Sequence, residues 1–517
     1  MSYSELEIGV GNFPTIASTK YSDKEAIYCV KTERRFTFKE FNSRINGLGN
    51  GLVEMGLKKG DVCAFLVDNR AEIFETYAAL AKTGIIGLPL NCRMEQSQMV
   101  NYINLTDANT IVFCDDSRDS VSGAVDSLPD IKRYIYVGDD PPNFALSYEE
   151  LIDRASKGEP TAAVAGRDNQ FINLTSGTTG LPKPFFITHG SNFAALPIFA
   201  FAHDITQDDT ILTVIPITGR SGFSWCGVGL FTGAKNVILN FDPIKILETI
   251  QQERITITTW VPIIASVILR LPDLDKYDLS SLRGLVFTGG PLSENLLEQI
   301  NERLCPNVYE YYGLSECGLL TNIGPEGKKK KPGSVGTPYF GAEIQILNDD
   351  GKDAPIGETG EIVAKSIAQT IGYFKDNEKT RETIKDGWFY TGDLGKFDED
   401  GFLYISGRKD DILTIGENEV SSVDVEKVIK TNEAVLDCAV IALPDKQGGK
   451  ILAAVVMRNP RMDLTKEELY TFCSEKLDVL KTPEKFIFTT NIPRTPTGKI
   501  QKYFLVKKYQ DLDYTAK

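Results

Sequence analysis

Short runs rich in β-branched residues alternate with helical patterns along the middle of the chain, and this alternation constrains the fold more than any other feature. Four runs predict strands, at residues 235–240, 256–262, 282–290 and 307–313. Two further segments predict helices, at 243–255 and at 293–304, where Ser293 is a suitable N-cap. Strands that end in glycine turns before helices place ligand sites at the carboxyl edge of a mostly parallel sheet. The fold class expected is therefore α/β, with mostly parallel sheets in a large N-terminal domain.

The length of the chain and a change of pattern predict more than one domain. A chain of 517 residues is too long for a single hydrophobic core. The segment 332–366 is dense in glycine and proline, which predicts a β-rich subdomain. From about residue 420 a helix–strand–strand–helix pattern begins, and it predicts a small α+β domain at the C-terminal end. The lysine run at 328–331 is expected to be a solvated loop.

Charge and composition argue against several classes of protein. The net charge is −15, from 56 basic and 71 acidic residues, so no nucleic-acid partner is expected. The N-terminal MSYSELEIGVGN lacks the order of a signal peptide, and no apolar run approaches the ~18 residues of a transmembrane helix. The nine cysteines include no CxxC pair, which predicts reduced core thiols in a cytoplasmic protein. The sequence leaves the oligomeric state open, and a homodimer is compatible with it.

Histidine chemistry is nearly excluded, because His189 and His203 are the only two histidines in the sequence. Two histidines cannot build a multi-histidine zinc site, and they leave little room for a histidine-based catalytic triad. Any catalysis is therefore expected to use lysine, arginine, carboxylates and hydroxyls, or bound metal and phosphate.

The segment TSGTTGLPKP, residues 175–184, combines hydroxyl residues, two glycines and a lysine. Its spacing is not that of a Walker A loop. Its glycines nevertheless allow backbone N–H groups to face an anion, and Lys183 adds a positive charge. Composition alone leaves two interpretations open, a phosphate-binding loop and a polar surface turn.

Further stretches follow this loop in order: TGGPL (288–292), YYGLSE (311–316), YTGD (390–393), GRKDD (407–411) and RTPTGKIQK (494–502). In order and spacing they resemble the motifs of the adenylate-forming superfamily, which includes acyl-CoA synthetases, peptide-synthetase adenylation domains and beetle luciferases. The resemblance covers residues 25 to 505. It implies an AMP-forming acyl-CoA ligase, in which a carboxylate attacks the α-phosphate of ATP, pyrophosphate leaves, and coenzyme A then takes the acyl group. It also implies Mg²⁺, because charge accumulates on phosphate oxygens during the first step.

The resemblance assigns most of the quoted residues to an ATP site. The loop would wrap the β- and γ-phosphates with Thr175, Ser176, Gly177, Thr178, Thr179, Gly180 and Lys183. Tyr312 would stack on adenine, Ser315 would contact the α-phosphate, and Glu316 would hold Mg²⁺. Asp393 would accept hydrogen bonds from both ribose hydroxyls, and Arg408 would donate to the ribose. The other residues expected at this site are Gly289, Gly290, Tyr311 and Gly313.

The resemblance also implies a catalytic set and a hinge. Lys499 is similar to the lysine that bridges the carboxylate and the α-phosphate during adenylation, and Thr175 and Glu316 complete the catalytic set. Asp410 takes the hinge position of the superfamily, so the expected domains are 1–409 and 411–517. In the superfamily the small domain rotates between the half-reactions, which withdraws the lysine and opens a channel for the thiol of coenzyme A.

An acyl pocket is expected beside residues 215–225, where relatives often carry an aromatic–histidine pair after a proline. Small residues stand at the nearest equivalent positions here and should open that wall. The set expected at the pocket is Gly219, Ser221, Gly222, Gly313, Leu319 and Leu320. These residues favour an apolar aromatic, alicyclic or medium-chain acid. Arg220 leaves two interpretations open, a partner for a second substrate carboxylate and a side chain that points to solvent or phosphate.

Two positions depart from the superfamily pattern. Pro184 follows the loop lysine where glycine is usual, which fixes φ and removes a donor. Glu417 stands where glycine is common near the thiol channel, which puts the coenzyme A half-reaction in question. Two alternatives therefore remain, an enzyme that loads a carrier protein and a non-catalytic nucleotide-binding member. The first is disfavoured because no unexplained insertion blocks domain rotation, and the second because Lys499, Glu316 and Asp393 are retained.

Overall fold

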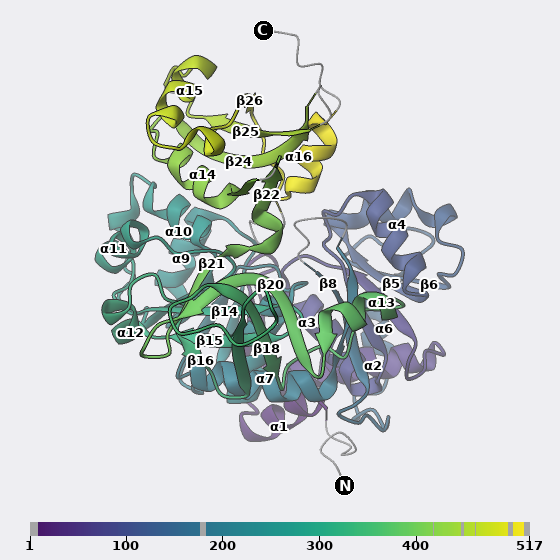
Figure 1. The fold of residues 1–517 in the computed structure, drawn as a ribbon. Helices are drawn as coiled ribbons and strands as arrows, with labels where there is room; N and C mark the ends of the chain where they lie inside the picture. Colours follow the sequence, from purple (N-terminus) through teal and green to yellow (C-terminus); the bar gives the residue numbers. More distant parts are fainter. Residues whose placement is uncertain are drawn as a thin grey trace.

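A computed structural model describes residues 9–175, 182–416, 418–445, 449–460, 462–494 and 500–510 of the chain. Two large sheets form most of it, and a smaller unit lies above them at the C-terminal end (Figure 1). The nine-stranded sheet contains, in spatial order, β16 (Thr337–Pro338), β15 (Gly318–Ile323), β14 (Val308–Leu314), β13 (Gly284–Phe287), β12 (Ile257–Trp260), β10 (Thr210–Thr213), β11 (Lys235–Ile238), β1 (Glu25–Cys29) and β2 (Arg34–Thr37). The seven-stranded sheet contains β7 (Leu146–Ser147), β6 (Arg133–Val137), β5 (Ala108–Cys114), β3 (Val62–Leu66), β4 (Ile86–Pro89), β8 (Asn169–Leu174) and β9 (Pro184–Thr188).

Both sheets are mostly parallel, which confirms the α/β fold class. In the nine-stranded sheet β1, β11, β10, β12, β13 and β14 pair in parallel, and β15 returns antiparallel beside β14. The helices expected between these strands are α9 (Pro243–Glu253) and α11 (Glu294–Arg303). Ser293 caps α11 as expected, since its Oγ accepts a hydrogen bond from the Leu296 N–H at 3.3 Å. The carboxyl ends of β13 and β14 therefore lie side by side, where the glycine turns predicted them.

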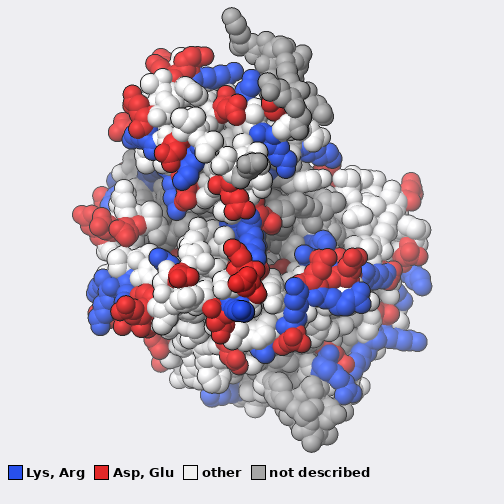
Figure 2. Space-filling view, in the orientation of Figure 1, with Lys and Arg blue, Asp and Glu red and all other residues white. Residues whose placement is uncertain are grey.

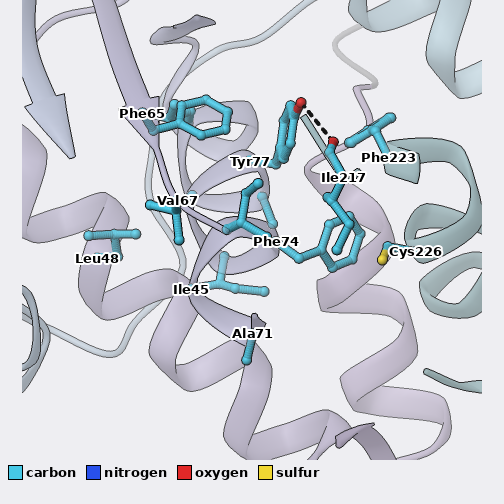
Figure 3. Packing of buried hydrophobic residues seen from close by; sticks show 14 of the residues in the cluster. Ile45, Leu48, Phe65, Val67, Ala71, Phe74, Tyr77, Ile217, Phe223 and Cys226 are labelled. Atoms are coloured by element: carbon cyan, nitrogen blue, oxygen red, sulfur yellow. Dashed lines mark hydrogen bonds between the residues drawn. The ribbon is translucent and has the colours of Figure 1, made fainter. Parts of the chain in front are cut away.

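The two sheets share one hydrophobic core, and helices fill the space between them. This core joins α2 (Phe38–Glu54), α3 (Ala71–Thr83) and α8 (Arg220–Thr232) to strands of both sheets. In Figure 3, Phe74 and Tyr77 of α3 pack beside Phe223 of α8, and the Tyr77 hydroxyl donates to the Ile217 carbonyl at 3.2 Å. The remaining helices of the large part are α1 (Asn12–Lys20), α4 (Gln96–Leu105), α5 (Arg118–Ser122), α6 (Tyr148–Arg154), α7 (His189–Ala202), α10 (Pro262–Leu269) and α12 (Pro325–Lys330).

The predicted β-rich subdomain and the small C-terminal unit are both present. A five-stranded antiparallel sheet contains β17 (Ala342–Leu347), β18 (Gly360–Ser366), β20 (Trp388–Phe397), β19 (Ile384–Lys385) and β21 (Leu403–Arg408), with α13 (Asn377–Thr383) beside it. The C-terminal unit contains β22 (Ile412–Ile415), β23 (Asn418–Ser421), α14 (Ser422–Lys430), β24 (Val435–Pro444), β25 (Lys450–Arg458), α15 (Lys466–Ser474), β26 (Lys485–Thr489) and α16 (Lys502–Tyr509). Its helix–strand–strand–helix order is the one that the sequence predicts.

Surface and thiol features agree with the composition. All nine cysteines are buried and form no disulfide. Acidic and basic side chains are interspersed over the face shown in Figure 2. Within the described part of the chain, no helix has both the length and the apolar character needed to cross a membrane.

The prediction of a solvated loop at the lysine run was wrong. Residues Pro325–Lys330 form α12, and the Lys328 side chain is only 3% exposed. Its ammonium lies 2.5 Å from Oε2 of Glu310 on β14 and also donates to the Ser334 carbonyl at 3.2 Å. A lysine can be buried where a carboxylate and a carbonyl satisfy it, and neither partner is visible from the local sequence.

The two histidines predict a specific pH dependence of stability. Both rings are fully buried, and burial lowers the pKa of each imidazole from 6.5 to about 4. Between those values the unfolded chain binds protons that the folded chain does not, so the free energy of unfolding falls as the pH falls. We expect His203→Asn to reduce the loss of stability between pH 6.5 and 5 by about 2 kcal/mol, measured by chemical denaturation. An unchanged pH dependence would show that His203 does not titrate in this window.

Candidate active site

Main-chain contacts close the base of the candidate phosphate loop between β8 and β9. The Thr175 N–H donates to the Lys183 carbonyl at 2.9 Å, and the Lys183 N–H donates to Thr175 Oγ1 at 2.8 Å. Pro184 begins β9, and its carbonyl accepts from the Phe374 N–H at 2.8 Å. The two ends of the loop are thus held together. Five of its predicted residues, as well as Lys499, lie outside the described residues: Ser176, Gly177, Thr178, Thr179 and Gly180.

The loop lysine pairs with a carboxylate that sequence reasoning missed. The Lys183 ammonium lies 3.2 Å from Oδ2 of Asp376, and both side chains are partly exposed. Asp376 is also the N-cap of α13, where its Oδ1 accepts from the Lys379 N–H at 2.9 Å. That hydrogen bond, followed by Lys183, lowers the pKa of Asp376. The segment 372–380 has no glycine-rich loop to draw attention to it, so only the pairing of β9 with this segment reveals the contact.

Tyr312, Asp393 and Arg408 converge from three strands. The Tyr312 hydroxyl donates to Oδ2 of Asp393 at 2.7 Å, and the Arg408 Nε lies 2.9 Å from Oδ1. Asp393 and Arg408 face each other in the β20–β21 register, and the Asp393 N–H donates to Thr391 Oγ1 at 3.0 Å. Burial, and then the charge of Asp393, raise the pKa of Tyr312 well above its usual value, so the phenol remains a donor. A carboxylate held from both sides is well placed to accept from neighbouring ligand hydroxyls.

Glu316 lies in the turn between β14 and β15, directly after Ser315. Its carboxylate is partly exposed, and Oε1 accepts from the Tyr373 hydroxyl at 3.5 Å. The Glu316 carbonyl accepts from the Thr370 N–H at 2.6 Å. In the described part of the chain, no cluster of three or more histidine, cysteine or carboxylate side chains could hold a metal ion. A single carboxylate suits Mg²⁺, which takes one or two protein carboxylates and completes its shell with phosphates and water.

The glycine turn after β13 offers open backbone. Gly289 has φ +82°, a conformation that side chains rarely adopt. A Cβ added to Gly290 would meet only the Pro262 Cδ, at 3.9 Å. Gly290 therefore has open space where a side chain would lie, and both glycines are partly exposed.

The structure separates two tyrosines that the sequence analysis placed in one nucleotide site. Neighbouring residues of a strand point to opposite faces. Tyr312 packs with the β-rich subdomain, whereas Tyr311 packs against Phe199 of α7, with ring centroids 5.4 Å apart. The Tyr311 hydroxyl donates to Ser221 Oγ at 3.3 Å. Tyr311 therefore lies beside Ser221, one of the acyl-pocket candidates, and not beside Asp393.

The same alternation separates the two leucines expected to share one wall of the acyl pocket. Leu319 joins the core that contains Tyr311, and Leu320 joins the core that contains Tyr312. Only Leu319 lies on the face of the sheet where Ser221 lies.

Packing explains two of the glycines expected at the pocket. A Cβ on Gly222 would lie 2.3 Å from the Pro216 carbonyl oxygen, and one on Gly313 would lie 2.2 Å from the Gly318 carbonyl oxygen. Both positions require glycine with or without a ligand. Gly219, the N-cap of α8, has only an ordinary contact at 3.5 Å and leaves space beside it.

Arg220 does not point to solvent, so that part of the interpretation was wrong. The residue is 4% exposed, and its guanidinium donates to the carbonyls of Ser315 at 2.8 Å and Ala368 at 2.6 Å. Nothing in its spacing or in the local sequence predicts these contacts.

The hinge candidate Asp410 lies between two anchored neighbours. Lys409 pairs with Glu361 of β18 at 2.6 Å, and Asp411 pairs with Lys502 of α16 at 3.0 Å. Asp410 itself is exposed in a short turn between β21 and β22. The chain is thus fixed to the β-rich subdomain on one side of Asp410 and to the C-terminal unit on the other.

Comparison with known proteins shows the family of this chain. A family model described as AMP-binding enzyme matches residues 15–374, and one described as the C-terminal domain of AMP-binding enzymes matches residues 424–499. The chain therefore belongs to the AMP-binding enzyme family, within the adenylate-forming superfamily.

Relatives in this family include ligases of several acids. The chain is 31% identical over 488 residues to the long-chain-fatty-acid–CoA ligase FadD13 of Mycobacterium tuberculosis H37Rv, which covers 92% of this chain and 94% of the relative. Its fold is similar to that of ATP-bound MatB of Rhodopseudomonas palustris, with a TM-score of 0.86 and 27% identity. The match covers 98% of this chain and 99% of MatB. Its fold is also similar to that of the o-succinylbenzoate CoA synthetase MenE of Bacillus subtilis in complex with its acyl-adenylate, with a TM-score of 0.83 and 25% identity. The match covers 96% of this chain and 97% of MenE.

Proposed function

We propose that the protein is an AMP-forming carboxylic acid–CoA ligase that uses ATP, Mg²⁺ and coenzyme A in the cytoplasm. A carboxylate and ATP give acyl-AMP and pyrophosphate, and acyl-AMP and coenzyme A then give acyl-CoA and AMP. The observation that carries the proposal is the convergence of Tyr312, Asp393 and Arg408 beside the Ser315–Glu316 turn, in a chain of this family. The buried, unpaired cysteines support the cytoplasm.

The described residues suit the parts of ATP in turn. Asp393 has lone pairs left for ribose hydroxyls after accepting from Tyr312, and Arg408 stands beside it. The loop whose ends Thr175 and Lys183 hold together would offer main-chain donors and the Lys183 ammonium to the β- and γ-phosphates. Glu316 would hold Mg²⁺, which when bound neutralises charge on the phosphate oxygens.

Lys499 is proposed as the residue that places positive charge between the substrate carboxylate and the α-phosphate. Electrostatic stabilisation of the charge that develops there is what this step requires. An antiparallel β-bridge joins Arg494 and Ile500, the two described residues that flank the segment with Lys499.

The substrate is proposed to be an apolar aromatic, alicyclic or medium-chain acid. The space beside Gly219 and the apolar character of the buried Tyr311, Phe199 and Leu319 support this class. The acids named for two relatives, a long-chain fatty acid and o-succinylbenzoate, also support it.

We further propose that residues 1–409 and 411–517 move as two domains about Asp410. Among the residues that the structure describes, two hydrophobic clusters consist only of residues after 412, and the other four consist only of residues before 404. Since each side has its own core, a rotation at Asp410 breaks no shared core.

Release of pyrophosphate and AMP tests the proposed function. The protein would be supplied with MgATP and a panel of benzoates, cyclohexane carboxylates, C4 to C16 fatty acids and dicarboxylates, with and without coenzyme A. We expect turnover with one class of acid, and we expect it only when coenzyme A is present. One equivalent of pyrophosphate, unaffected by coenzyme A, would instead favour a carrier-protein acceptor and direct attention to Glu417. No release with any acid would support a non-catalytic member.

The pairing of Lys183 with Asp376 predicts a variant that binds MgATP more tightly. Asparagine caps helices about as well as aspartate, so Asp376→Asn should keep α13 while it releases Lys183. We expect Kd for MgATP to fall about two- to fivefold. The reason is that Lys183 no longer has to break its ion pair with Asp376 before it contacts phosphate. Calorimetric titration measures this change. Glu382→Gln, which removes a pair with Lys379 on the same helix, is the control and should leave Kd unchanged. Weaker binding by Asp376→Asn would show instead that the carboxylate assists the nucleotide.

A further inference from the structure

Arg220 is a buried cation whose two shortest hydrogen bonds go to main-chain carbonyls. It is the first residue of α8, and its neighbour Ser221 contacts Tyr311. Its Nη1 donates to the Ser315 carbonyl at 2.8 Å, and its Nη2 donates to the Ala368 carbonyl at 2.6 Å. Nη2 also lies 3.5 Å from Asn192 Oδ1. The guanidinium thus spans three separate segments of the chain.

Burying this charge is costly, and within the described part of the chain no close ion pair offsets the cost. Burial lowers the pKa of Arg220 to about 10, against the opposing effect of nearby Cys317 and Glu316. A guanidinium with such a pKa still carries its charge at neutral pH. Among the described residues, no carboxylate lies within 4.0 Å of it. Two carbonyls are a weak replacement for a counter-ion, so stability alone is a poor reason for an arginine here.

Both carbonyls belong to segments that hold the candidate metal ligand. Ser315 directly precedes Glu316, and Arg220 fixes the carbonyl between them. Ala368 leads to Thr370, whose N–H donates to the Glu316 carbonyl at 2.6 Å. The main chain of Glu316 is therefore held on one side by Arg220 and on the other by a segment that Arg220 also holds.

We propose that Arg220 is a positioning residue for adenylation, which fixes the Ser315–Glu316 turn so that the Glu316 carboxylate faces the metal and phosphates. It also ties this turn to the first turn of α8, on the acyl side of the site. The inference rests on the proposed function, because it assumes that Ser315 and Glu316 contact MgATP. The guanidinium donates to protein carbonyls. Holding the Ser315–Glu316 turn in place therefore fits the geometry better than binding a substrate carboxylate.

The test compares the binding of ATP with and without Mg²⁺ by the full-length protein. Isothermal titration calorimetry would give Kd for MgATP and for ATP in EDTA for the wild type, Arg220→Met and Arg220→Lys. We expect Arg220→Met to weaken MgATP binding about tenfold and to change binding of metal-free ATP little, so that most of the Mg²⁺-dependent gain is lost. Arg220→Lys should be intermediate, because its ammonium keeps the charge but lacks the fork that reaches both carbonyls. Arg154→Met, at an exposed surface pair, should match the wild type.

The outcomes separate this inference from its premise. Equal weakening with and without Mg²⁺, or no weakening, would overturn the positioning role and leave Arg220 as a packing residue. If Arg220→Met fails to fold, as judged by its thermal transition, the ratio of the two affinities in Arg220→Lys decides the question in the same way. A wild-type protein that binds no MgATP would refute the proposed function instead.

Discussion

Lys499→Ala should lower the rate of acyl-adenylate formation about a hundredfold to a thousandfold, while the protein still makes acyl-CoA from supplied acyl-adenylate and coenzyme A. The physical reason is that positive charge placed where phosphate charge develops stabilises only the first step. Removing one such donor typically costs this much in rate. Pyrophosphate–ATP exchange measures the first half-reaction, and thioester formation from the synthetic adenylate measures the second.

The control for this variant is Lys507→Ala, an exposed lysine on α16 in the same unit. It should leave both half-reactions at the wild-type rate. Equal loss of both half-reactions in Lys499→Ala would contradict the assigned role and point to damage of the C-terminal unit. Retention of full exchange activity would mean that another group supplies the charge.

Lys328→Met should destabilise the folded protein by about 3–5 kcal/mol, because it leaves Glu310 buried without its partner. Burial already raises the pKa of Glu310, and Lys328 is the charge that opposes this. Restoring a neutral, well-packed pair with Lys328→Met and Glu310→Leu together should recover most of the loss. Chemical denaturation followed by tryptophan fluorescence measures the free energy of unfolding.

Lys330→Met is the matched control for this prediction, since it removes an exposed lysine from the same helix. It should change the free energy of unfolding by less than about 0.5 kcal/mol. A single variant Lys328→Met as stable as Lys330→Met would show that solvent reaches Glu310 in the folded protein. Because Glu310 precedes Tyr312 by two residues on β14, the unstable variant is also expected to bind ATP less tightly.

Features that depend on neighbouring residues could be predicted from the sequence. The Ser293 cap is one, since it needs only a hydroxyl three residues before an N–H. The strand-and-helix alternation from 235 to 313 is another, because hydrophobic periodicity is a local property. The order of the motifs sufficed for the family, which the family model matched over residues 15–374.

The alternation of side chains along a strand is also a local property, and it separates residues that the motifs group together. Tyr311 and Tyr312 are adjacent, as are Leu319 and Leu320, so each pair must divide between the two faces of the sheet. The structure shows this division, with Tyr312 beside Asp393 and Tyr311 beside Ser221.

The sequence by itself determined the α/β class, the position of the glycine turns and the residue types available to bind phosphate. Only the tertiary structure decided which charges are buried and what each one contacts. Arg220 meets Ser315 across 95 residues of chain, Tyr312 meets Asp393 across 81, and Lys183 meets Asp376 across 193. The free energy of a buried charge depends on the partners that folding brings to it, and no local pattern records those partners.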